Sequence, residues 1–322
     1  MPAAPPRFLN CRLWRRGILD PAGPARVNWR ILWGMAGIHL LAALAFIPWL
    51  FSWSGLGCAV VAYYLFGVLG INVGYHRLLT HRSFSCPRWL EHTLAVLGFC
   101  CRQGTPMTWV AIHRLHHQHS DEPGDPHSPR DSFFWGHMGW FLINDPSVFN
   151  IGLYDRYARD LFQDRFYKWL ERPRVGHAIE RAVWAAFLVL GALVGGLGTG
   201  SFVGVVQLGL SWFVWGVFVR TVVHLHATWA VNSITHRWGY RNFGTPDDSR
   251  NNWLVAVLSN GEGWHNNHHA EPRCAAHGRR WWEMDVSYLI IRGLERVGLV
   301  WDVIKPRRRP PADQPEERRA AA

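Results

Sequence analysis

Charged residues are missing from two long stretches of this sequence. The chain has 322 residues, of which 34 are Lys or Arg and 23 are Asp or Glu, yet none of these lies within 31–76 or within 182–219. A helix needs about 20 apolar residues to cross a bilayer, so each stretch is long enough for two crossings. Turn-forming residues interrupt both stretches, in SWSGLG from Ser52 and in GGLGTGS from Gly195.

We therefore predict an all-α integral membrane protein with four transmembrane helices in two hairpins. A buried hairpin in a soluble protein is disfavoured, because the apolar runs are too long for it. The predicted spans are about 31–51, 56–76, 178–197 and 202–225.

Both predicted hairpin turns also lack Lys and Arg, so every basic residue falls on the other side of the membrane. The positive-inside rule then places both termini and residues 77–181 in the cytoplasm. The predicted organisation is a cytoplasmic N-terminal segment, a main domain whose cytoplasmic helical cap has two parts, and a disordered basic tail. These regions are 1–30, 31–304, with the cap at 77–177 and 226–304, and 305–322.

Cysteine is scarce, with six residues and no C-x-x-C pair, which excludes a disulfide framework and a cysteine zinc ribbon. A reduced compartment fits this usage. The formal net charge of +11 invites a nucleic-acid partner, but no helix-turn-helix, zinc-finger or RNA-binding motif is present. We therefore expect no nucleic-acid partner and a basic face against anionic membrane lipid.

Histidine, by contrast, is abundant and clustered. Nine of the 18 histidines lie in four short boxes on the predicted cytoplasmic side. The boxes are HRLLTH (His76, His81), HRLHH (His113, His116, His117), NSITH (ending at His236) and HNNHH (His265, His268, His269).

Helical spacing predicts which histidines of a box lie on the same face of a helix. Residues three or four apart share a helix face, so His113 can pair with His116 or His117, and His265 with His268 or His269. Adjacent histidines diverge by about 100° and can therefore face two different ions. His76 and His81 are five apart, so we expect the helix to end or bend between them, or each to serve a different ion.

Imidazole nitrogen binds iron, zinc and copper, and does not suit magnesium or calcium. Nine imidazoles exceed the coordination of one ion, so the sequence predicts two metals. Asn232 precedes His236 by four residues and can hold a metal-bound water from the same face. The remaining histidines, among them His39, His137, His224, His226 and His277, are interpreted as structural or as supporting the ligands.

The boxes and their flanks resemble the membrane acyl desaturases of the stearoyl-CoA Δ9-desaturase type. The pattern H-x-x-x-x-H, H-x-x-H-H, N-S-x-x-H and H-x-x-H-H occurs in that order around two membrane hairpins. The matching flanks are GYHRLLTHRSF, HRLHHQHSDEPGDPHSP, FFWGHMGW, HATWAVNSITH and GEGWHNNHHAEP, and the resemblance spans roughly residues 31–301.

The resemblance implies that the nine histidines bind two irons, with Asn232 acting through a water. It also implies that O2 and two electrons remove two hydrogens from a saturated fatty acyl chain, with Δ9 as the expected position and acyl-CoA as the favoured carrier. Animal acyl-CoA enzymes of this type carry Arg-Asp before the second box, where this chain has Ala111 and Ile112. Carrier protein and intact lipid therefore remain open as carriers. Glu271 replaces the aromatic residue that commonly follows the last box, and nothing physical explains it.

Electrons are expected from a separate protein, such as a ferredoxin, a rubredoxin or an NAD(P)H oxidoreductase, because no H-P-G-G segment of a haem module is present. The chain has two lysines, Lys168 and Lys305, beside many arginines, which favours a GC-rich bacterium and its inner membrane.

Five other residues near the boxes or in the spans are candidates for support or specificity. Asp121, Asp125 and Glu262 flank the boxes and can each orient a ligand histidine or cap a turn. Tyr64 and Gly67 precede His76 and are candidates either for setting chain length or for ordinary helix packing.

Two other functions compete with desaturation. A histidine-box hydroxylase, ketolase or epoxygenase would share the oxidant. A metal transporter would place its ligands near mid-bilayer, whereas the boxes sit at the span ends.

Overall fold

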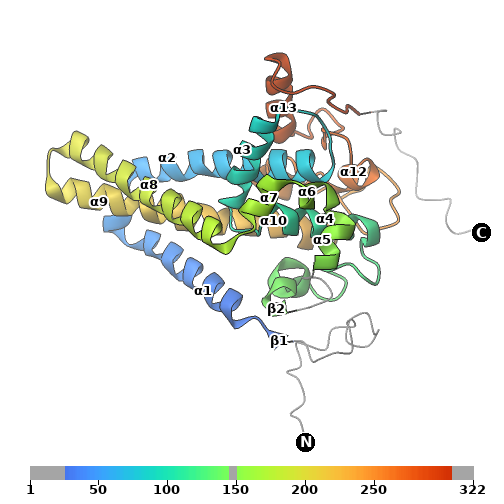
Figure 1. Cartoon of the computed structure of the whole chain (residues 1–322), viewed down its shortest axis with the longest axis horizontal. Helices are drawn as coiled ribbons and strands as arrows, with labels where there is room; N and C mark the ends of the chain where they lie inside the picture. The colour runs from blue at the N-terminus through green and yellow to red at the C-terminus, as the bar shows by residue number, and fades with distance from the viewer. Residues whose placement is uncertain (1–25, 145–150, 307–322) are drawn as a thin grey trace, which may run out of the picture.

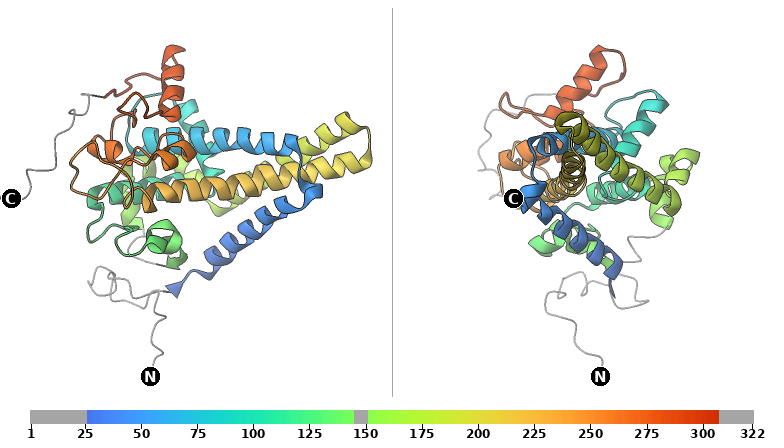
Figure 2. Two further views of the ribbon diagram at one scale, coloured as in Figure 1. Left: turned by 180° about the vertical axis from the view of Figure 1, so that it is seen from behind. Right: turned by 90° about the vertical axis from the view of Figure 1, so that its left-hand side faces the viewer.

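The structure of the chain is a computed structural model that describes residues 26–144 and 151–306. Long helices extend to one side as a stem, and short helices gather at the other end as a cap (Figures 1 and 2). Sheet is limited in these residues to one antiparallel pair of two-residue strands, β1 (Arg26–Val27) with β2 (Ile143–Asn144). The predicted all-helical class is confirmed. Most of the predicted N-terminal segment (1–25) and of the tail predicted to be disordered (307–322) lies outside the described residues.

Four helical segments are long and apolar enough to cross a membrane, as the charge-free stretches predict. They are Trp29–Phe46 (α1, Trp29–Ala43, with η3, Leu44–Phe46), Trp53–Thr80 (α2, Trp53–Ala62, with η5, Tyr63–Thr80), Pro173–Thr199 (α8), and Phe202–Ser233 (α9, Phe202–Phe213, η8, Val214–Val219, and α10, Arg220–Ser233). Large apolar side chains stand exposed on the stem, including Phe46 and Leu197, each 89% exposed. Such surface is stable when lipid covers it.

The first hairpin turn lies just before the motif that predicts it, and the second lies at the end of its motif. In the first, η4 (Pro48–Leu50) makes the connection, and the Ser52 hydroxyl accepts from Gly55 N–H and starts α2 at Trp53. In the second, α8 continues to Thr199 and ends at Gly200, whose φ of 62° suits glycine.

Two glycines of these motifs, Gly55 and Gly195, serve close packing between helices. A Cβ on Gly195 would lie 2.1 Å from the carbonyl oxygen of Gly204 in the facing helix. Gly195 therefore lets α8 and α9 approach each other closely.

Part of the second span is a π-helix, η5, which carries the first histidine box. In a π-helix each N–H bonds to the carbonyl five residues earlier, and His81 N–H donates to His76 O at 3.1 Å. His76 and His81 therefore share one face, with ring centroids 4.8 Å apart. The expected end between them occurs at Thr80, with His81 as the C-cap, and the wider winding of the last turn still keeps both rings on one side.

The cap is built from short helices that enclose the boxes. In the first half these are α3 (Arg88–Phe99), α4 (Pro106–His119), η6 (Trp135–Gly139), η7 (Trp140–Leu142), α5 (Ile151–Tyr157), α6 (Arg159–Phe162) and α7 (Arg165–Leu170). In the second half they are α11 (Trp253–Leu258), α12 (His265–Ala270) and α13 (Val286–Arg296). The core runs from η5 into α3 and α4, through residues such as Tyr75, Leu94 and Val110, so it fixes two boxes relative to each other.

Candidate metal centre

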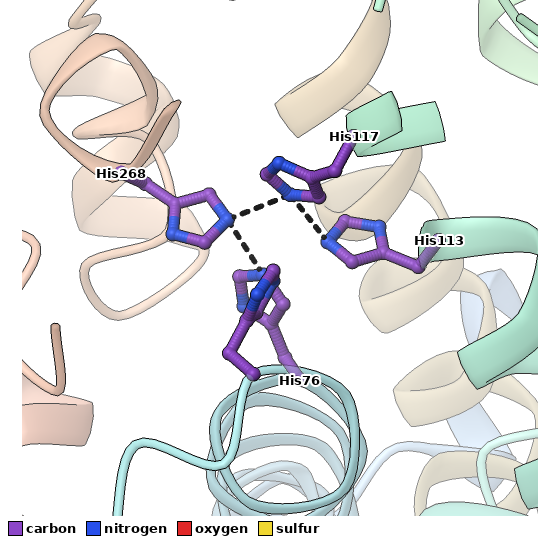
Figure 3. A group of neighbouring side chains, drawn as sticks. His76, His113, His117 and His268 are labelled. Atoms are coloured by element: carbon purple, nitrogen blue, oxygen red, sulfur yellow. Dashed lines mark hydrogen bonds between the residues drawn. The ribbon is translucent and has the colours of Figure 1, made fainter. Parts of the chain in front are cut away.

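Five of the nine box histidines form a first cluster. They are His76, His81, His113, His117 and His268, from η5, its C-terminal end, α4 and α12, and their ring nitrogens lie within 4.8 Å of one another. Figure 3 shows four of these rings turned toward a common centre. Nε2 of His268 lies 3.0 Å from Nε2 of both His76 and His117, and the Nε2 atoms of His117 and His113 are 3.1 Å apart.

The other four box histidines form a second cluster beside the first. They are His116, His236, His265 and His269, with ring nitrogens again within 4.8 Å. Nε2 of His265 lies 3.1 Å from Nε2 of His236. The clusters are adjacent because neighbouring residues of one helix divide between them, His117 and His268 in the first and His116 and His269 in the second. This is the division that the 100° step allows.

In four of the box histidines, Nδ1 lies within hydrogen-bonding distance of a carboxylate. Nδ1 of His76 is 2.5 Å from Glu262 Oε2, and Nδ1 of His236 is 2.6 Å from Asp121 Oδ2. Nδ1 of His116 is 3.0 Å from both Asp125 oxygens. Each Nδ1–H donates to its carboxylate, which leaves the Nε2 lone pair directed into the cluster.

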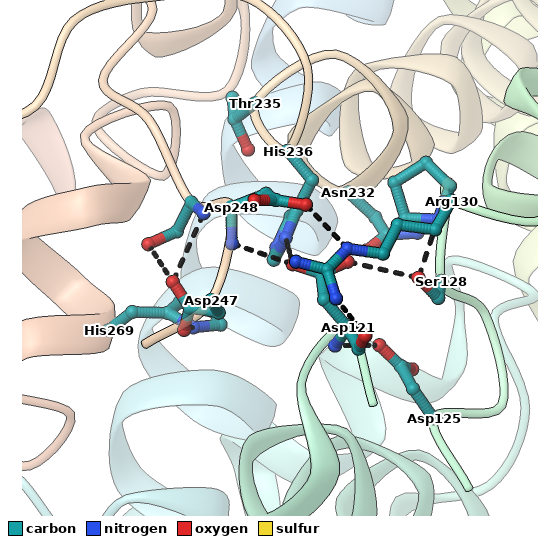
Figure 4. Close-up of polar contacts among 12 residues, drawn as sticks. Asp121, Asp125, Ser128, Arg130, Asn232, Thr235, His236, Asp247, Asp248 and His269 are labelled. Atoms are coloured by element: carbon teal, nitrogen blue, oxygen red, sulfur yellow. Dashed lines mark hydrogen bonds and ion pairs between the residues drawn. The ribbon is translucent and has the colours of Figure 1, made fainter. Parts of the chain in front are cut away.

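The fourth carboxylate, Asp247, accepts from His269 Nδ1 at 2.6 Å and was not predicted (Figure 4). Asp247 lies in the segment TPDDS, away from every histidine box, so the sequence does not distinguish it from an ordinary turn residue. Asp121, Asp125 and Glu262 occupy the supporting positions that their places in the sequence suggest.

Burial and neighbouring charges favour the neutral form of three histidines in the first cluster. Burial, reinforced by the neighbouring imidazoles, holds the pKa of His113, His117 and His268 well below the ordinary histidine value. Neutral imidazole is the form that binds a metal.

The supporting carboxylates of the second cluster are ionised. Burial alone would raise the pKa of Asp121, but the hydrogen bond from His236 outweighs it and lowers that pKa to about 2. The pKa values of Asp125 and Asp247 are also lowered, since His116 and His269 outweigh the effect of burial.

Asn232 lies where a water-mediated contact is possible. Its Nδ2 donates to the carbonyls of His127 and Gly136 at 2.7 Å, which fixes the orientation of the amide. Its Oδ1 is buried without a hydrogen-bond partner, and the residue lines the same cavity as His116 and His265. A buried acceptor without a partner is costly, so this oxygen fits a water or another donor in the cavity.

Five of the nine histidines outside the boxes fall into two sets. His277 and His127 lie against the clusters, with ring centroids 4.4 Å from His268 and 4.5 Å from His116, respectively. His39, His226 and His137 instead form a hydrogen-bonded bridge, with N···N distances of 3.0 Å, that ties α1 to α10 and η6. These positions agree with the structural and supporting roles predicted for them.

A cavity of about 390 Å³ passes beside both clusters. Its wall is largely apolar and includes Ile71, Trp109, Ile112 and Leu225, and it reaches Met35 of α1. Such a space suits a long apolar ligand that passes the metal-binding nitrogens.

The predicted chain-length residues need correction. Tyr64 is 42% exposed and lies outside the lining, whereas Tyr63 lines the cavity together with His224. Gly67 provides the room for His224, because a Cβ at Gly67 would lie 2.0 Å from Cδ2 of that ring. Trp109 both lines the cavity and stacks on His113 with ring centroids 4.8 Å apart.

The donor set fits two transition-metal ions. Two nitrogens that are each about 2.1 Å from one ion and at right angles lie about 3.0 Å apart, which matches the spacing of His76, His117 and His268. All-imidazole clusters with carboxylates behind them suit iron, zinc or copper and do not suit magnesium or calcium.

The geometry agrees with comparisons to known proteins. A family described as "Fatty acid desaturase" matches residues 49–292. The sn-1 stearoyl-lipid 9-desaturase of Anabaena variabilis is 42% identical over 278 residues, covering 86% of this chain and 94% of that protein. The sn-2 palmitoyl-lipid 9-desaturase of Nostoc sp. (strain 36) is 42% identical over 83% of this chain and 86% of its own length.

An enzyme from Anemone leveillei, named "Acyl-CoA 5-desaturase AL21", is 38% identical over 290 residues, or 87% of this chain and 84% of its own length. The relatives thus include enzymes named for lipid-linked and for CoA-linked chains. The four apolar helices, the paired histidine clusters and these matches lead to one conclusion: the chain belongs to the fatty acid desaturase family.

Proposed function

We propose that this desaturase inserts a cis Δ9 double bond into a saturated acyl chain of a membrane glycerolipid, using two irons and O2. Family membership makes the chain an oxidoreductase that desaturates fatty acyl chains. The bond position, the lipid carrier and iron are the proposal. The observation that carries it is the apolar cavity beside two clusters of buried histidines.

The residues assigned to the metals follow the clusters. His76, His81, His113, His117 and His268 would hold one iron; His116, His236, His265 and His269 would hold the other, with Asn232 acting through a water. When bound, the irons would activate O2 so that hydrogen can be removed from an unactivated methylene. The balanced reaction converts –CH2–CH2– with O2, two electrons and two protons into –CH=CH– and two waters.

The chain's own residues position the substrate and keep water away. Trp109 Nε1 donates to Gln103 Oε1 at 3.2 Å, and Gln103 Nε2 donates to Thr228 Oγ1 at 2.9 Å. These contacts pair the polar groups of Trp109, Gln103 and Thr228 with one another, so this part of the wall presents apolar surface to a chain. The histidine clusters lie beside one part of this wall, and metals held there would select the methylenes that react.

The carrier is assigned from the second histidine box. Ala111 is fully buried in the core, and Ile112 lines the acyl cavity, so neither presents a charge to the phosphates of CoA. Two relatives with 42% identity are named for lipid-linked chains. A glycerolipid chain therefore fits these positions better than acyl-CoA or an acyl carrier protein.

Topology and the electron donor complete the proposal. The absence of basic residues at both stem turns supports a cytoplasmic cap in a bacterial inner membrane. A separate ferredoxin, rubredoxin or NAD(P)H oxidoreductase would dock on the cap and supply the electrons.

The test compares carriers in one preparation. Purified iron-loaded protein with a donor system is given stearoyl chains as phosphatidylglycerol or galactolipid in nanodiscs, or as stearoyl-CoA, and the products are analysed by mass spectrometry. We expect 9-octadecenoyl product from lipid and at least tenfold less from stearoyl-CoA. Faster turnover of stearoyl-CoA would overturn the carrier assignment, and a hydroxylated product would overturn the reaction.

A further inference from the structure

A second cavity, of about 380 Å³, lies at the boundary between cap and stem. It is bounded by the start of α1, the connection between α3 and α4, the start of α8, and the η8–α10 junction. Four arginines line it: Arg30, Arg102, Arg172 and Arg220. None of them lies in a histidine box or contacts the metal-binding nitrogens.

Arg220 is the unusual member of this set. It is 3% exposed and lies within the span Phe202–Ser233. Its Nε donates to Gly216 O at 3.1 Å and its Nη1 to Cys100 O at 3.0 Å, and its guanidinium lies 4.8 Å from the centre of the Phe66 ring. In the part of the chain that the structure describes, no carboxylate forms an ion pair with it. A guanidinium held in a membrane span without an anion is costly and marks a functional site.

The charge of the cavity is positive. Glu180 pairs with Arg102 and leaves the other three arginines without an ion-pair partner among the described residues. Glu171 is the one further carboxylate in the lining, so two positive charges remain in excess. One phosphodiester anion would offset part of this excess.

The lining changes from polar to apolar toward the membrane, along both helices that form its deeper wall. On α8, Arg172 stands at the N-cap, Glu180, which pairs with Arg102, lies farther along, and Val183 and Trp184 lie deepest in the span. On the last span, Arg220 is nearer the cap and Val217 is nearer the stem. A phospholipid has this same gradient, from charged headgroup to acyl chain.

We propose that this cavity binds the phosphate of an anionic glycerophospholipid, with the glycerol and one chain toward Val183 and Val217. Basic pockets between membrane helices on the cytoplasmic side bind such headgroups. Arg30 and Arg172 sit at the cap ends of two spans, where phosphates of a bilayer lie, and Arg220 supplies the buried donor. Arg102 and Gly104 line both this cavity and the acyl cavity, so the bound lipid lies next to the path of the substrate.

The experiment measures lipid binding and is independent of the proposed reaction. Delipidated protein is titrated with phosphatidylglycerol and followed by native mass spectrometry. The variant combines Arg30→Gln and Arg172→Gln, which lie at the rim and leave the core intact. The matched control is Arg174→Gln, an exposed arginine two residues farther along α8 that does not line the cavity.

We expect one phosphatidylglycerol per chain in the wild type and in Arg174→Gln. Each rim arginine should raise the affinity for phosphatidylglycerol about fivefold, so the double variant should bind this lipid about 25-fold more weakly. Equal binding by the double variant and the control would overturn the proposal. Arg220→Gln, if folded, should weaken binding further.

Two ligand controls separate the sources of the phosphate. Diacylglycerol has the same chains without phosphate and should not be retained, so equal retention would show an apolar groove instead. Millimolar inorganic phosphate should raise the melting temperature less than phosphatidylglycerol does. Stabilisation by inorganic phosphate alone would mean a free-anion site and would overturn the lipid assignment.

Discussion

The substitution Asp121→Asn tests the negative charge that lies next to His236 in the second cluster. Oδ2 of Asp121 accepts from His236 Nδ1 at 2.6 Å and from Asp248 N–H at 2.9 Å, while Oδ1 accepts from Ser128 Oγ at 3.0 Å. An Asn side chain can keep its oxygen toward His236 and turn its amide toward Ser128, whose hydroxyl can accept. The backbone also tolerates the change, because φ at this position is 60° and Asn is favoured there.

The substitution therefore removes the negative charge and little else. Supporting partners of this kind are worth about 10- to 100-fold in metal affinity, which corresponds to about 1.4–2.8 kcal/mol. The loss should fall on the cluster of His236 and spare that of His76, whose partner is Glu262. Under a graded chelator challenge, iron in the variant should drop from two toward one per chain.

The assay is iron content by elemental analysis, with circular dichroism to confirm folding. Glu122→Gln is the matched control, since this neighbour is exposed and contacts neither cluster. If Asp121→Asn kept both irons as tightly as Glu122→Gln does, the assigned role of the carboxylate would be wrong.

Three further predictions follow from the site. His268→Ala and His116→Ala should each abolish turnover while the chain stays membrane-inserted, and full activity in either would reject the ligand assignment. His224→Ala should lengthen the acyl cavity and shift products toward longer chains, whereas an unchanged chain-length profile on gas chromatography would place the cavity end elsewhere. In chelator-stripped protein, the lowered pKa values of His113, His117 and His268 mean that the unfolded chain binds more protons. Stability should therefore be full above the unfolded pKa of about 6.5 and fall as pH drops below it, and a melting temperature unchanged between pH 7.5 and pH 5.5 would contradict this.

The sequence predicted the elements whose signal is local. Charge-free runs indicate membrane spans directly, because apolar lipid surrounds a span along its whole length. The division of His116 from His117, and of His268 from His269, follows from the fixed 100° step of a helix. The grouping of boxes that lie far apart in the chain came from the resemblance, since spacing alone cannot bring α4 and α12 together.

Other features depend on packing that no local pattern records. The π-helical winding of η5 brings His76 and His81 into one cluster. Asp247 reaches His269 through the fold of a loop. Whether Tyr63 or Tyr64 lines the cavity depends on the rotation of one helix about its axis. Gly67 leaves the space that the His224 ring occupies.

The central claim is tested most directly by fatty acid analysis of cells that lack their own desaturase and express this chain with a compatible electron donor. Total fatty acids are measured by mass spectrometry, with His236→Ala as the inactive control and membrane insertion checked in both. The account predicts a new 9-monounsaturated acid from the wild type and none from the variant. Hydroxylated chains, or the same new acid from His236→Ala, would contradict it.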